Sequence, residues 1–523
     1  MSQPMHGVIS AGDPQTAATG VEILRQGGNA VDAAVAAAFA SFIAEVGVVH
    51  LGGSGVAHLY DGRTGLARVY DFFSTMPGLG GQPPDHLDFE AVTIDYGPTT
   101  QQFFLGRGSV AVPGNIAGLC RLAADYGRLP LTVLLQPAIR MAKEGVQLTA
   151  FQAETCDLLT PLYTHTDGMR AVFAGNGRMI RPGERIVIPN LADTFQALAT
   201  HGAEYARTGP LAQALLADQA AHGGLLTERD LLAYGVRRVP SIRVDYRGYE
   251  VLLPPLSSAG GVLTAFTLKL LAGMDVTQRP HGSAAHLQLL FEIMAATARA
   301  RKEWDALVES LPGDEAATRF LADTSVAPYR EEVREALAAH TPSSLVGEPP
   351  GPSSTSHLSV IDGDGLAVSL TTTAGESAGY VVPGTGFIPN NILGEEDLHP
   401  QGFHTQPAGQ RIATMMTPTI ILKDGQPRLV VGSGGSIRIR SAIMQVLSNL
   451  LDYHLRLNDA VNLARVHLDN GVLQCEGGTD PRAMDELESW GYAINRWATR
   501  SIYFGGAHSV SRTENRPSGR CRR

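Results

Sequence analysis

Three serine- or glycine-rich segments could carry chemistry, and the first is the hydroxyl cluster Ser353-Ser354-Thr355-Ser356-His357. A threonine hydroxyl is a poor nucleophile until a base takes its proton, and a free α-amino group, with a pKa of about 7.7–8.0 in peptides, can be that base. This chemistry needs a flexible segment that can be cut before the threonine and a rigid strand after it. The same residues also fit an ordinary polar start to a strand, so both interpretations stay open.

The second segment, Gly375-Glu376-Ser377-Ala378-Gly379, fits the G-x-S-x-G pattern of a serine hydrolase. That pattern places its serine on a turn between a strand and a helix. A strand precedes it here, but the next residues, 380–386, contain Pro383, Gly384 and Gly386 and cannot form the helix. A glycine-rich loop is the competing interpretation, and a serine esterase using Ser377 remains an alternative.

The third segment, Gly432-Ser433-Gly434-Gly435-Ser436, lies between a predicted strand and a predicted helix. A dinucleotide-binding fingerprint would need glycine where Ile437 stands. The segment is therefore either a tight turn or a site where backbone N–H groups hold an oxyanion, and the spacing does not decide. The 16 histidines are scattered and no metal-ligand motif is present, so no metal is expected. His357 could support the first segment or serve in packing.

The elements that must position these segments follow from local signals. Two strands, 357–361 and 366–373, are joined by Asp362-Gly363-Asp364-Gly365, which predicts a hairpin. Asn29 and Asp32 begin a helix over 30–40, as an N-cap and a first-turn carboxylate. Other predicted elements are strands at 56–60 and 428–431, a strand or hairpin at 242–253, and helices at 116–126, 262–272, 284–304, 438–453 and 480–490.

Two segments in the C-terminal half of the chain are poor in apolar residues. Four prolines and four serines in His340–Ser354 predict an exposed linker that can be cut. Residues 513–523 are polar, and we expect them to be loosely held. The linker directly precedes Thr355, which is where a cuttable segment is needed.

Overall composition limits the class of protein. With 523 residues, 44% hydrophobic and 18% charged, the chain is neither disordered nor fibrous, and length alone suggests three or four domains. A formal charge of −10 argues against a nucleic-acid partner. The four cysteines form no CxxC, the N-terminal residues lack a signal-peptide pattern, and the apolar stretch 30–49 is too polar to span a membrane. We expect a cytoplasmic globular protein.

At these residues the chain resembles the γ-glutamyltranspeptidase family, over nearly its whole length and in the family's order. The segments that carry the resemblance are GGNAVDAAVA (27–36), LGGSG (51–55), VPGNIAG (112–118), GGLLTERDLLAY (223–234), DYRGYEVLLPPLSSAGG (245–261), TSHLSVIDGDGLAVSLTTT (355–373), GTGFIPNN (384–391), MTPTI (416–420) and GSGGS (432–436). The resemblance favours the nucleophile interpretation of Thr355 over the polar strand start.

The resemblance implies an N-terminal-nucleophile hydrolase of the α+β class, a four-layer αββα sandwich made as one inactive precursor. It implies autocatalytic cleavage between Ser354 and Thr355, so that residues 1–354 and 355–523 stay together as a heterodimer sharing one globular domain. Thr355 then matches the nucleophile, Thr373 a second threonine bonded to it, and Gly434 and Gly435 the oxyanion hole. The implied activity is that of a γ-glutamyltransferase or glutathione hydrolase, which passes an acyl group from a small-molecule amide to water or an amine without a cofactor.

The positions that recognise the glutamyl group depart from the family pattern. Phe73 stands where relatives have an arginine for the substrate carboxylate, and a phenyl ring cannot form a bidentate cationic contact. Gly375 replaces an asparagine, and Thr414-Met415 replaces a Ser-Ser pair. Glu395 could still bind an amino group. We therefore expect amide hydrolysis by Thr355 with weakened γ-glutamyl specificity; a non-glutamyl amide substrate, or a non-catalytic member of the fold, is the alternative.

Overall fold

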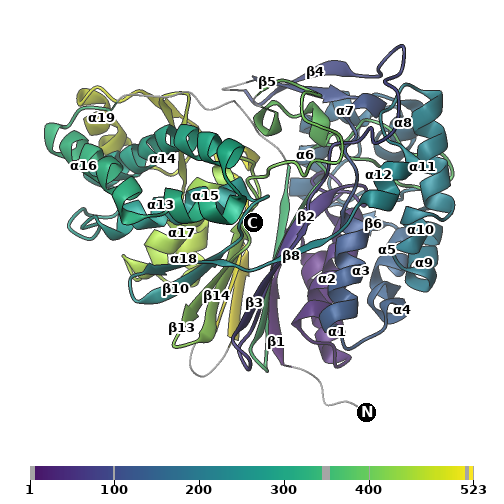
Figure 1. The fold of residues 1–523 in the computed structure, drawn as a ribbon, viewed down its shortest axis with the longest axis horizontal. Coiled ribbons are helices and arrows are strands. Elements are labelled where there is room, and N and C mark those ends of the chain that lie inside the picture. The colour runs from purple at the N-terminus through teal and green to yellow at the C-terminus, as the bar shows by residue number, and fades with distance from the viewer. Residues whose placement is uncertain (1–5, 98–99, 344–353, 400, 513–516, 522–523) are drawn as a thin grey trace.

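Two six-stranded antiparallel sheets lie face to face between two layers of helices (Figure 1). The computed structural model describes residues 6–97, 100–343, 354–399, 401–512 and 517–521. Most of the predicted linker, residues 344–353, lies outside the described residues. The layer order confirms the expected αββα sandwich.

The first sheet interleaves strands from both sides of Thr355. Its order is β1 (Gly7–Ser10), β11 (Ser356–Asp362), β12 (Leu366–Thr373), β2 (Ser54–Asp61), β3 (Leu66–Phe72) and β8 (Arg237–Val239). The second sheet runs β19 (Pro517–Cys521), β18 (Ala507–Arg512), β14 (Gln426–Ser433), β13 (Thr419–Lys423), β10 (Tyr249–Leu253) and β9 (Ile242–Tyr246). Buried apolar side chains such as Tyr60, Ile361, Leu252 and Val430 fill the space between the sheets.

Smaller strands lie outside the two sheets. They are β4 (Glu90–Asp95) with β5 (Thr100–Leu105), β6 (Val146–Gln147) with β7 (Arg185–Ile186), and β15 (Val466–Asp469) with β16 (Val472–Cys475) and β17 (Ile494–Arg496).

The outer layers divide along the chain. Helices on the side of the first sheet are α1 (Pro14–Arg25), α2 (Ala30–Ala44), α3 (Asn115–Tyr126), α4 (Leu131–Leu134), α5 (Gln136–Glu144), α6 (Ala150–Leu158), α7 (Thr160–Tyr163), α8 (Asp167–Phe173), α9 (Leu191–His201), α10 (Glu204–Arg207), α11 (Pro210–Ala221) and α12 (Glu228–Ala233). Those on the other side are α13 (Ala259–Ala272), α14 (Ala284–Ser310), α15 (Gly313–Phe320), α16 (Asp323–Ala339), α17 (Arg438–Leu451), α18 (Leu457–Asn462) and α19 (Pro481–Ser489). Helix α2 packs on β11 and β12, and α17 packs on β14.

Helix α2 shows how local sequence fixes the layer under β11. Asn29 accepts hydrogen bonds from the backbone of Val31 and Asp32, and the Asp32 carboxylate accepts one from the Asn29 N–H, so the predicted cap is a complete capping box. Every residue of this alanine-rich helix is buried, because apolar side chains surround it on all faces. The Asp362 carboxylate also accepts from the Ala30 N–H at 3.0 Å, which ties the β11–β12 hairpin to the start of α2.

The sequence placed the β11–β12 hairpin within one residue at its start. Ser356 pairs with Thr372, and Thr373 pairs with Ser54 at the start of β2. The expectation of a loose end after Arg512 is wrong for 517–521, which form β19 on the open edge of β18. Such an edge offers unpaired backbone donors and acceptors that a polar segment can join.

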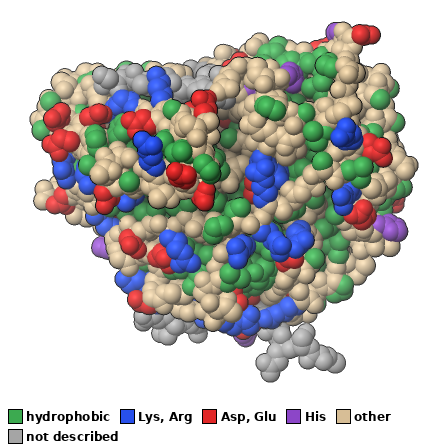
Figure 2. Space-filling model, in the orientation of Figure 1, with side chains coloured by type: hydrophobic (Ala, Val, Ile, Leu, Met, Phe, Trp, Pro, Cys, Tyr) green, Lys and Arg blue, Asp and Glu red, His purple; other side chains and the backbone are tan. Residues whose placement is uncertain are grey.

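The distribution of surface charge and the character of the helices complete the description of the fold. Acidic and basic side chains are both spread over the face in Figure 2. Within the described residues, no helix combines the length and apolar character that crossing a membrane requires.

Candidate active site at Thr355

The Ser354–Thr355 peptide bond lies at the start of β11 and is held on its acyl side by two hydrogen bonds. The Thr373 hydroxyl donates to the Ser354 carbonyl oxygen at 2.6 Å, and that hydroxyl accepts from the Gly375 N–H at 3.0 Å. The Ser354 N–H donates to Glu376 Oε1 at 2.8 Å. Ser354 is buried and Thr355 is half-buried, so the bond predicted to be cut is fixed within the end of the first sheet.

The glycine loop 432–436 approaches Thr355 from the second sheet. A Cβ at Gly434 would lie 2.0 Å from the Thr355 carbonyl oxygen, and Gly435 has a φ of +108°, so neither position accommodates a side chain. The Gly434 N–H donates to the Gly506 carbonyl at 3.2 Å. In the uncut chain the hydrogen bond to the Ser354 carbonyl therefore comes from Thr373. Of the two predicted oxyanion glycines, Gly434 lies against the neighbouring carbonyl of Thr355, and Gly435 lies against Gly505.

The loop after β12 carries Gly375 and brings Glu395 close to it. Gly375 has a φ of +69°, and a Cβ there would lie 2.2 Å from Asn391 Oδ1 and 2.5 Å from Glu395 Oε1. An asparagine at this position would clash with both. Asn391 Oδ1 accepts from the N–H groups of Glu376, at 2.7 Å, and Ser377, at 3.2 Å. Asn391 thus holds the loop that carries Glu376, a role the sequence reasoning missed.

Buried acids and one arginine surround this loop. Burial raises the pKa of Glu376 to about 8, and hydrogen bonds from Ser354 and the charge of Arg438 lower it in part. Burial also raises the pKa of Asp397, which accepts a hydrogen bond from the Ser436 hydroxyl in the glycine loop. Arg438 is buried at the first position of α17, three residues after Gly435. The sequence reasoning singled out the neighbouring segment 432–436 but not Arg438.

Phe73 lies at the same edge of the first sheet as Thr373, two strands away. The Ser54 hydroxyl, in the residue paired with Thr373, lies 2.7 Å from the Ser74 hydroxyl, and neighbouring strands are about 4.8 Å apart. The Phe73 ring is fully buried in an apolar cluster with Val56 and Met76. At the position where the family has an arginine, Phe73 therefore serves in core packing.

A different arginine, Arg411, contacts the Phe73 segment. Its guanidinium donates to the carbonyl oxygens of Phe73 and Gly235 and lies 3.7 Å from the Asp71 carboxylate. Because these partners are backbone oxygens and a buried acid, Arg411 braces the segment after β3. It was not anticipated from sequence, since it is far from Asp71 along the chain.

Thr414 and Met415 lie on the segment that follows Arg411, against the start of α13. The Thr414 N–H donates to the Ser257 carbonyl at 2.9 Å, and the Gly260 N–H donates to the Thr414 carbonyl at 3.1 Å. Both side chains are buried. Among the described residues, backbone hydrogen bonds join this segment to the start of α13 and, through the Ile412 N–H, to the Ser74 carbonyl.

Ser377 and His357 have structural partners. The Ser377 hydroxyl is fully buried and accepts from the Gly379 N–H at 3.1 Å, and no helix follows it. The His357 ring lies between the Thr371 and Ser359 hydroxyls, at 2.8 and 2.9 Å, and packs on Gly432, with a pKa lowered well below its usual value by burial. His357 therefore supports β11 and the glycine loop as a neutral ring.

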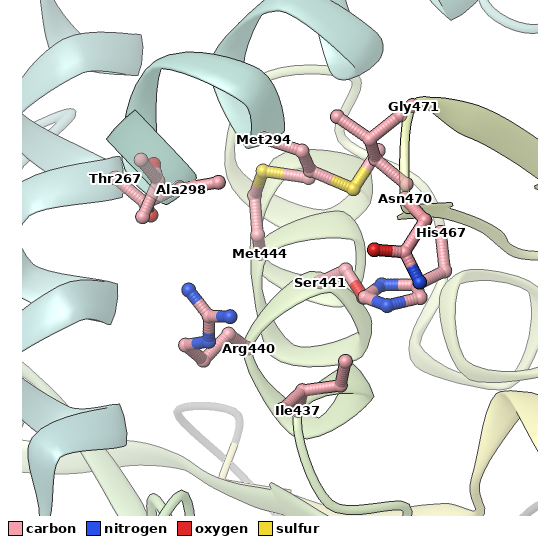
Figure 3. A pocket seen from close by; sticks show the side chains of 12 residues that line it. Thr267, Met294, Ala298, Ile437, Arg440, Ser441, Met444, His467, Asn470 and Gly471 are labelled. Atoms are coloured by element: carbon pink, nitrogen blue, oxygen red, sulfur yellow. The ribbon is translucent and has the colours of Figure 1, made fainter. Parts of the chain in front are cut away.

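A separate pocket lies beside the first half of α17. Figure 3 shows Arg440, Ser441 and Met444 of α17 facing Met294 of α14 and His467 of β15. None of the residues predicted from sequence lines it. The described site at Thr355 is distinct from this pocket.

Nearly the whole chain is similar to known proteins. The family described as Gamma-glutamyltranspeptidase matches residues 16–521. The chain is 32% identical over 498 residues to an acylase ACY 1 proenzyme of Pseudomonas sp. (strain V22), covering 94% of this chain and 87% of that protein. It is 29% identical over 518 residues to a glutathione hydrolase proenzyme of Escherichia coli (strain K12), covering 93% and 86%.

Among solved structures, a cephalosporin acylase from Bacillus halodurans matches with a TM-score of 0.81 and 25% identity, over 99% of this chain and 96% of that chain. A structure titled as a gamma-glutamyltranspeptidase from Pseudomonas nitroreducens complexed with L-DON matches with a TM-score of 0.53 and 27% identity, over 62% of this chain and 94% of that one. Thr355 and the glycine loop both fall within the residues that the family match covers.

Proposed function

The chain belongs to the γ-glutamyltranspeptidase family of enzymes, and we propose that it is a self-processing amidohydrolase whose nucleophile, Thr355, first cuts the chain and then cleaves an acyl amide. The relatives named as proenzymes support the processing step. The products would be residues 1–354 and 355–523, which remain associated. Membership in the family covers both glutathione hydrolases and acylases, so the substrate needs a separate argument.

The observation that carries the proposal is the hydrogen bond from the Thr373 hydroxyl to the Ser354 carbonyl oxygen, at 2.6 Å. A donor on that oxygen stabilises the negative charge that develops when a nucleophile attacks the carbonyl carbon. The same donor, itself fixed by the Gly375 N–H, orients the carbonyl at the residue next to Thr355. Such a donor favours self-cleavage, whereas an ordinary strand start does not need one.

The mature reaction uses the amine that cleavage creates. The α-amino group of Thr355 takes the proton of its own hydroxyl, and Oγ attacks the substrate carbonyl to form an ester. The amine side of the substrate leaves with that proton, and water or an amine then attacks the ester. We assign the N–H groups of Gly434 and Gly435 to the substrate oxyanion, and Thr373 to the nucleophile, as the family resemblance implies. In the uncut chain the Gly434 N–H donates to the Gly506 carbonyl instead, so this assignment requires that hydrogen bond to be exchanged for one to the substrate.

We propose that the acyl donor is an amide whose recognition does not depend on an arginine at position 73. Phe73 is buried in apolar packing, Arg411 is committed to Asp71 and to backbone oxygens, and Gly375 leaves no room for the family's asparagine. Glu395, buried beside Gly375, is the candidate partner for an amino group. The acylase relatives support a non-glutamyl amide, and γ-glutamyl transfer or glutathione hydrolysis is the second candidate, supported by the glutathione hydrolase relatives.

The test compares two hydroxyl variants. Thr355→Ala is expected to leave one uncut chain without amidase activity, because the nucleophile of both steps is lost. Ser377→Ala removes the alternative nucleophile, and we expect that chain to be cut and active. Loss of activity in Ser377→Ala, with an uncut and active Thr355→Ala chain, would favour the serine esterase; an uncut wild type inert toward all amides tested would favour a non-catalytic protein.

A further inference from the structure

Glu376 contacts the residue whose carbonyl is attacked during self-cleavage. Its Oε1 accepts the Ser354 N–H at 2.8 Å, and the residue is 1% exposed. The hydrogen bond joins the acyl half of the scissile bond to the loop after β12. No step of the family mechanism described above uses this carboxyl group.

We propose that Glu376 is a positioning residue for self-cleavage, which holds Ser354 by its N–H while Thr373 holds the carbonyl oxygen of the same residue. This inference rests on the proposed self-processing function. The two hydrogen bonds fix both polar backbone groups of Ser354, so they restrict rotation of the acyl half against Thr355 Oγ. Restricting a reactant to an attack geometry lowers the barrier of an intramolecular step.

The loop that carries Glu376 is itself braced. Asn391 Oδ1 accepts the Glu376 N–H at 2.7 Å, and Asn391 Nδ2 donates to the Phe104 carbonyl at 3.3 Å. Gly375 turns the chain immediately before, with a positive φ. The backbone that carries the Glu376 carboxyl group is therefore held in place, as a positioning role requires.

Self-cleavage needs no reactant other than the chain itself and water. Thr355 Oγ bonds to the Ser354 carbonyl carbon, the C–N bond to Thr355 breaks, and the hydroxyl proton ends on the freed amine. The product is an ester between Ser354 and Thr355. Water then splits the ester, leaving a carboxylate on Ser354 and restoring the Thr355 hydroxyl.

The charge of Glu376 gives this role a pH signature. Burial raises its pKa to about 8, so the group gains its charge as the pH rises through that value. An N–H bonds more strongly to a carboxylate than to a neutral acid. The titratable and charged groups around it are Arg438 of α17, Tyr96 after β4, Tyr163 of α7, His50 before β2 and Glu395 before the turn 396–398. Cleavage is expected to speed up about five- to tenfold between pH 6 and pH 9.

The experiment follows cleavage from the moment of synthesis. The full chain is made by cell-free translation, and the uncut fraction is measured by intact mass against time at pH 6 to 9. Wild type, Glu376→Ala, Glu376→Gln and Glu45→Gln are compared. Glu45→Gln is the matched control, because Glu45 is another buried carboxyl near the junction but bonds Ser356 instead of Ser354. Unfolding curves in a Thr355→Ala background check that each variant folds.

We expect Glu376→Ala to be cut about 10- to 100-fold more slowly at pH 9, since a hydrogen bond to a charged group is lost there. Glu376→Gln should approach the wild-type rate at pH 6 but lack the rise toward pH 9, while Glu45→Gln keeps that rise. Wild-type rates in Glu376→Ala, or an unchanged pH rise in a folded Glu376→Gln, would overturn the inference alone. A wild-type chain that is never cut after Ser354 would overturn the proposed function, and this inference with it.

Discussion

At the scale of single residues, the candidate site depends on the groups that contact Ser354, the residue before Thr355. Thr373 and Glu376 hold the two polar backbone groups of Ser354, and Gly434 packs on the Thr355 carbonyl. The site thus combines one hydroxyl at a strand start with partners from the next strand and from the opposite sheet.

The burial of Phe73 leads to a prediction about substrate specificity. Its ring is fully buried, so no cation from this position can reach a substrate carboxylate. We predict that glutathione and γ-glutamyl anilides are poor substrates of the cut enzyme, with KM values well above the low micromolar range, because a buried charge-assisted pair is worth several kcal/mol. Steady-state kinetics with γ-glutamyl and non-glutamyl anilides measure this. A low-micromolar KM for a γ-glutamyl anilide would mean that another cation binds the carboxylate.

The sequence allowed us to predict the site residues that stand in motifs. It did not allow us to predict residues whose contact partners are distant along the chain. Thr355, Thr373 and Gly434 stand in motifs at strand ends, and the structure brings them together. Arg411 and Asn391 could not be assigned, because their partners Asp71 and Phe104 lie hundreds of residues away and no local pattern links them. Glu376 was seen only as part of a G-x-S-x-G match, and its contact with Ser354 depends on the loop geometry.

At the scale of elements, the contact between α2 and β11 places a titrating group beside the nucleophile strand. Glu45 ends α2 and accepts a hydrogen bond from the Ser356 hydroxyl. Burial raises the pKa of Glu45 to about 7, the nearby Asp13 charge adds to the rise, and hydrogen bonds from Ser356 and Thr16 oppose it.

This shift predicts a pH dependence of stability. The unfolded chain loses the Glu45 proton near pH 4.5 and the folded chain near 7, so the folded state binds the extra proton between these values. The free energy of unfolding should therefore fall as the pH rises from 4.5 to 7, by an amount on the order of 2–3 kcal/mol from this group. Denaturant titrations of the uncut Thr355→Ala chain, with and without Glu45→Gln, measure the contribution of Glu45 to the free energy of unfolding. Equal slopes against pH in the two proteins would contradict the assignment.

Element boundaries were predictable where a capping or turn residue marks them. Asn29 and Asp32 fix the start of α2, and Asp362-Gly365 forms the β11–β12 turn. Helix α13 begins at Ala259, three residues before the predicted start, because the Ser258 hydroxyl accepts from the Gly261 N–H and caps the helix there. The strand β19 was not predictable, because its polar residues carry no alternating pattern and pair with β18 only when the edge of the second sheet is present.

At the scale of the whole molecule, the proposed cut lies at the start of a strand in a sheet that both pieces build. After cleavage β11 and β12, from the later piece, would still lie between β1 and β2 of the earlier piece, and β13 would still pair with β10. The length-based expectation of several domains fails for this reason, since strands from both sides of Thr355 build both sheets.

This topology predicts that the two pieces cannot separate without unfolding. Native size-exclusion chromatography of the cut protein should give one peak that contains both pieces, while denaturant should release them as two. The denatured sample is the control that the chain was cut. A native peak holding residues 355–523 alone would contradict the shared-sheet arrangement.

The central claim is that Thr355 is the nucleophile that cuts the chain before it. Intact mass measurement of the purified protein tests this most directly, because it reports cleavage and its position together. We expect two masses, corresponding to residues 1–354 and 355–523, and a single uncut mass for Thr355→Ala. An active wild-type protein of one uncut mass, or a Thr355→Ala chain cut at the same bond, would contradict it.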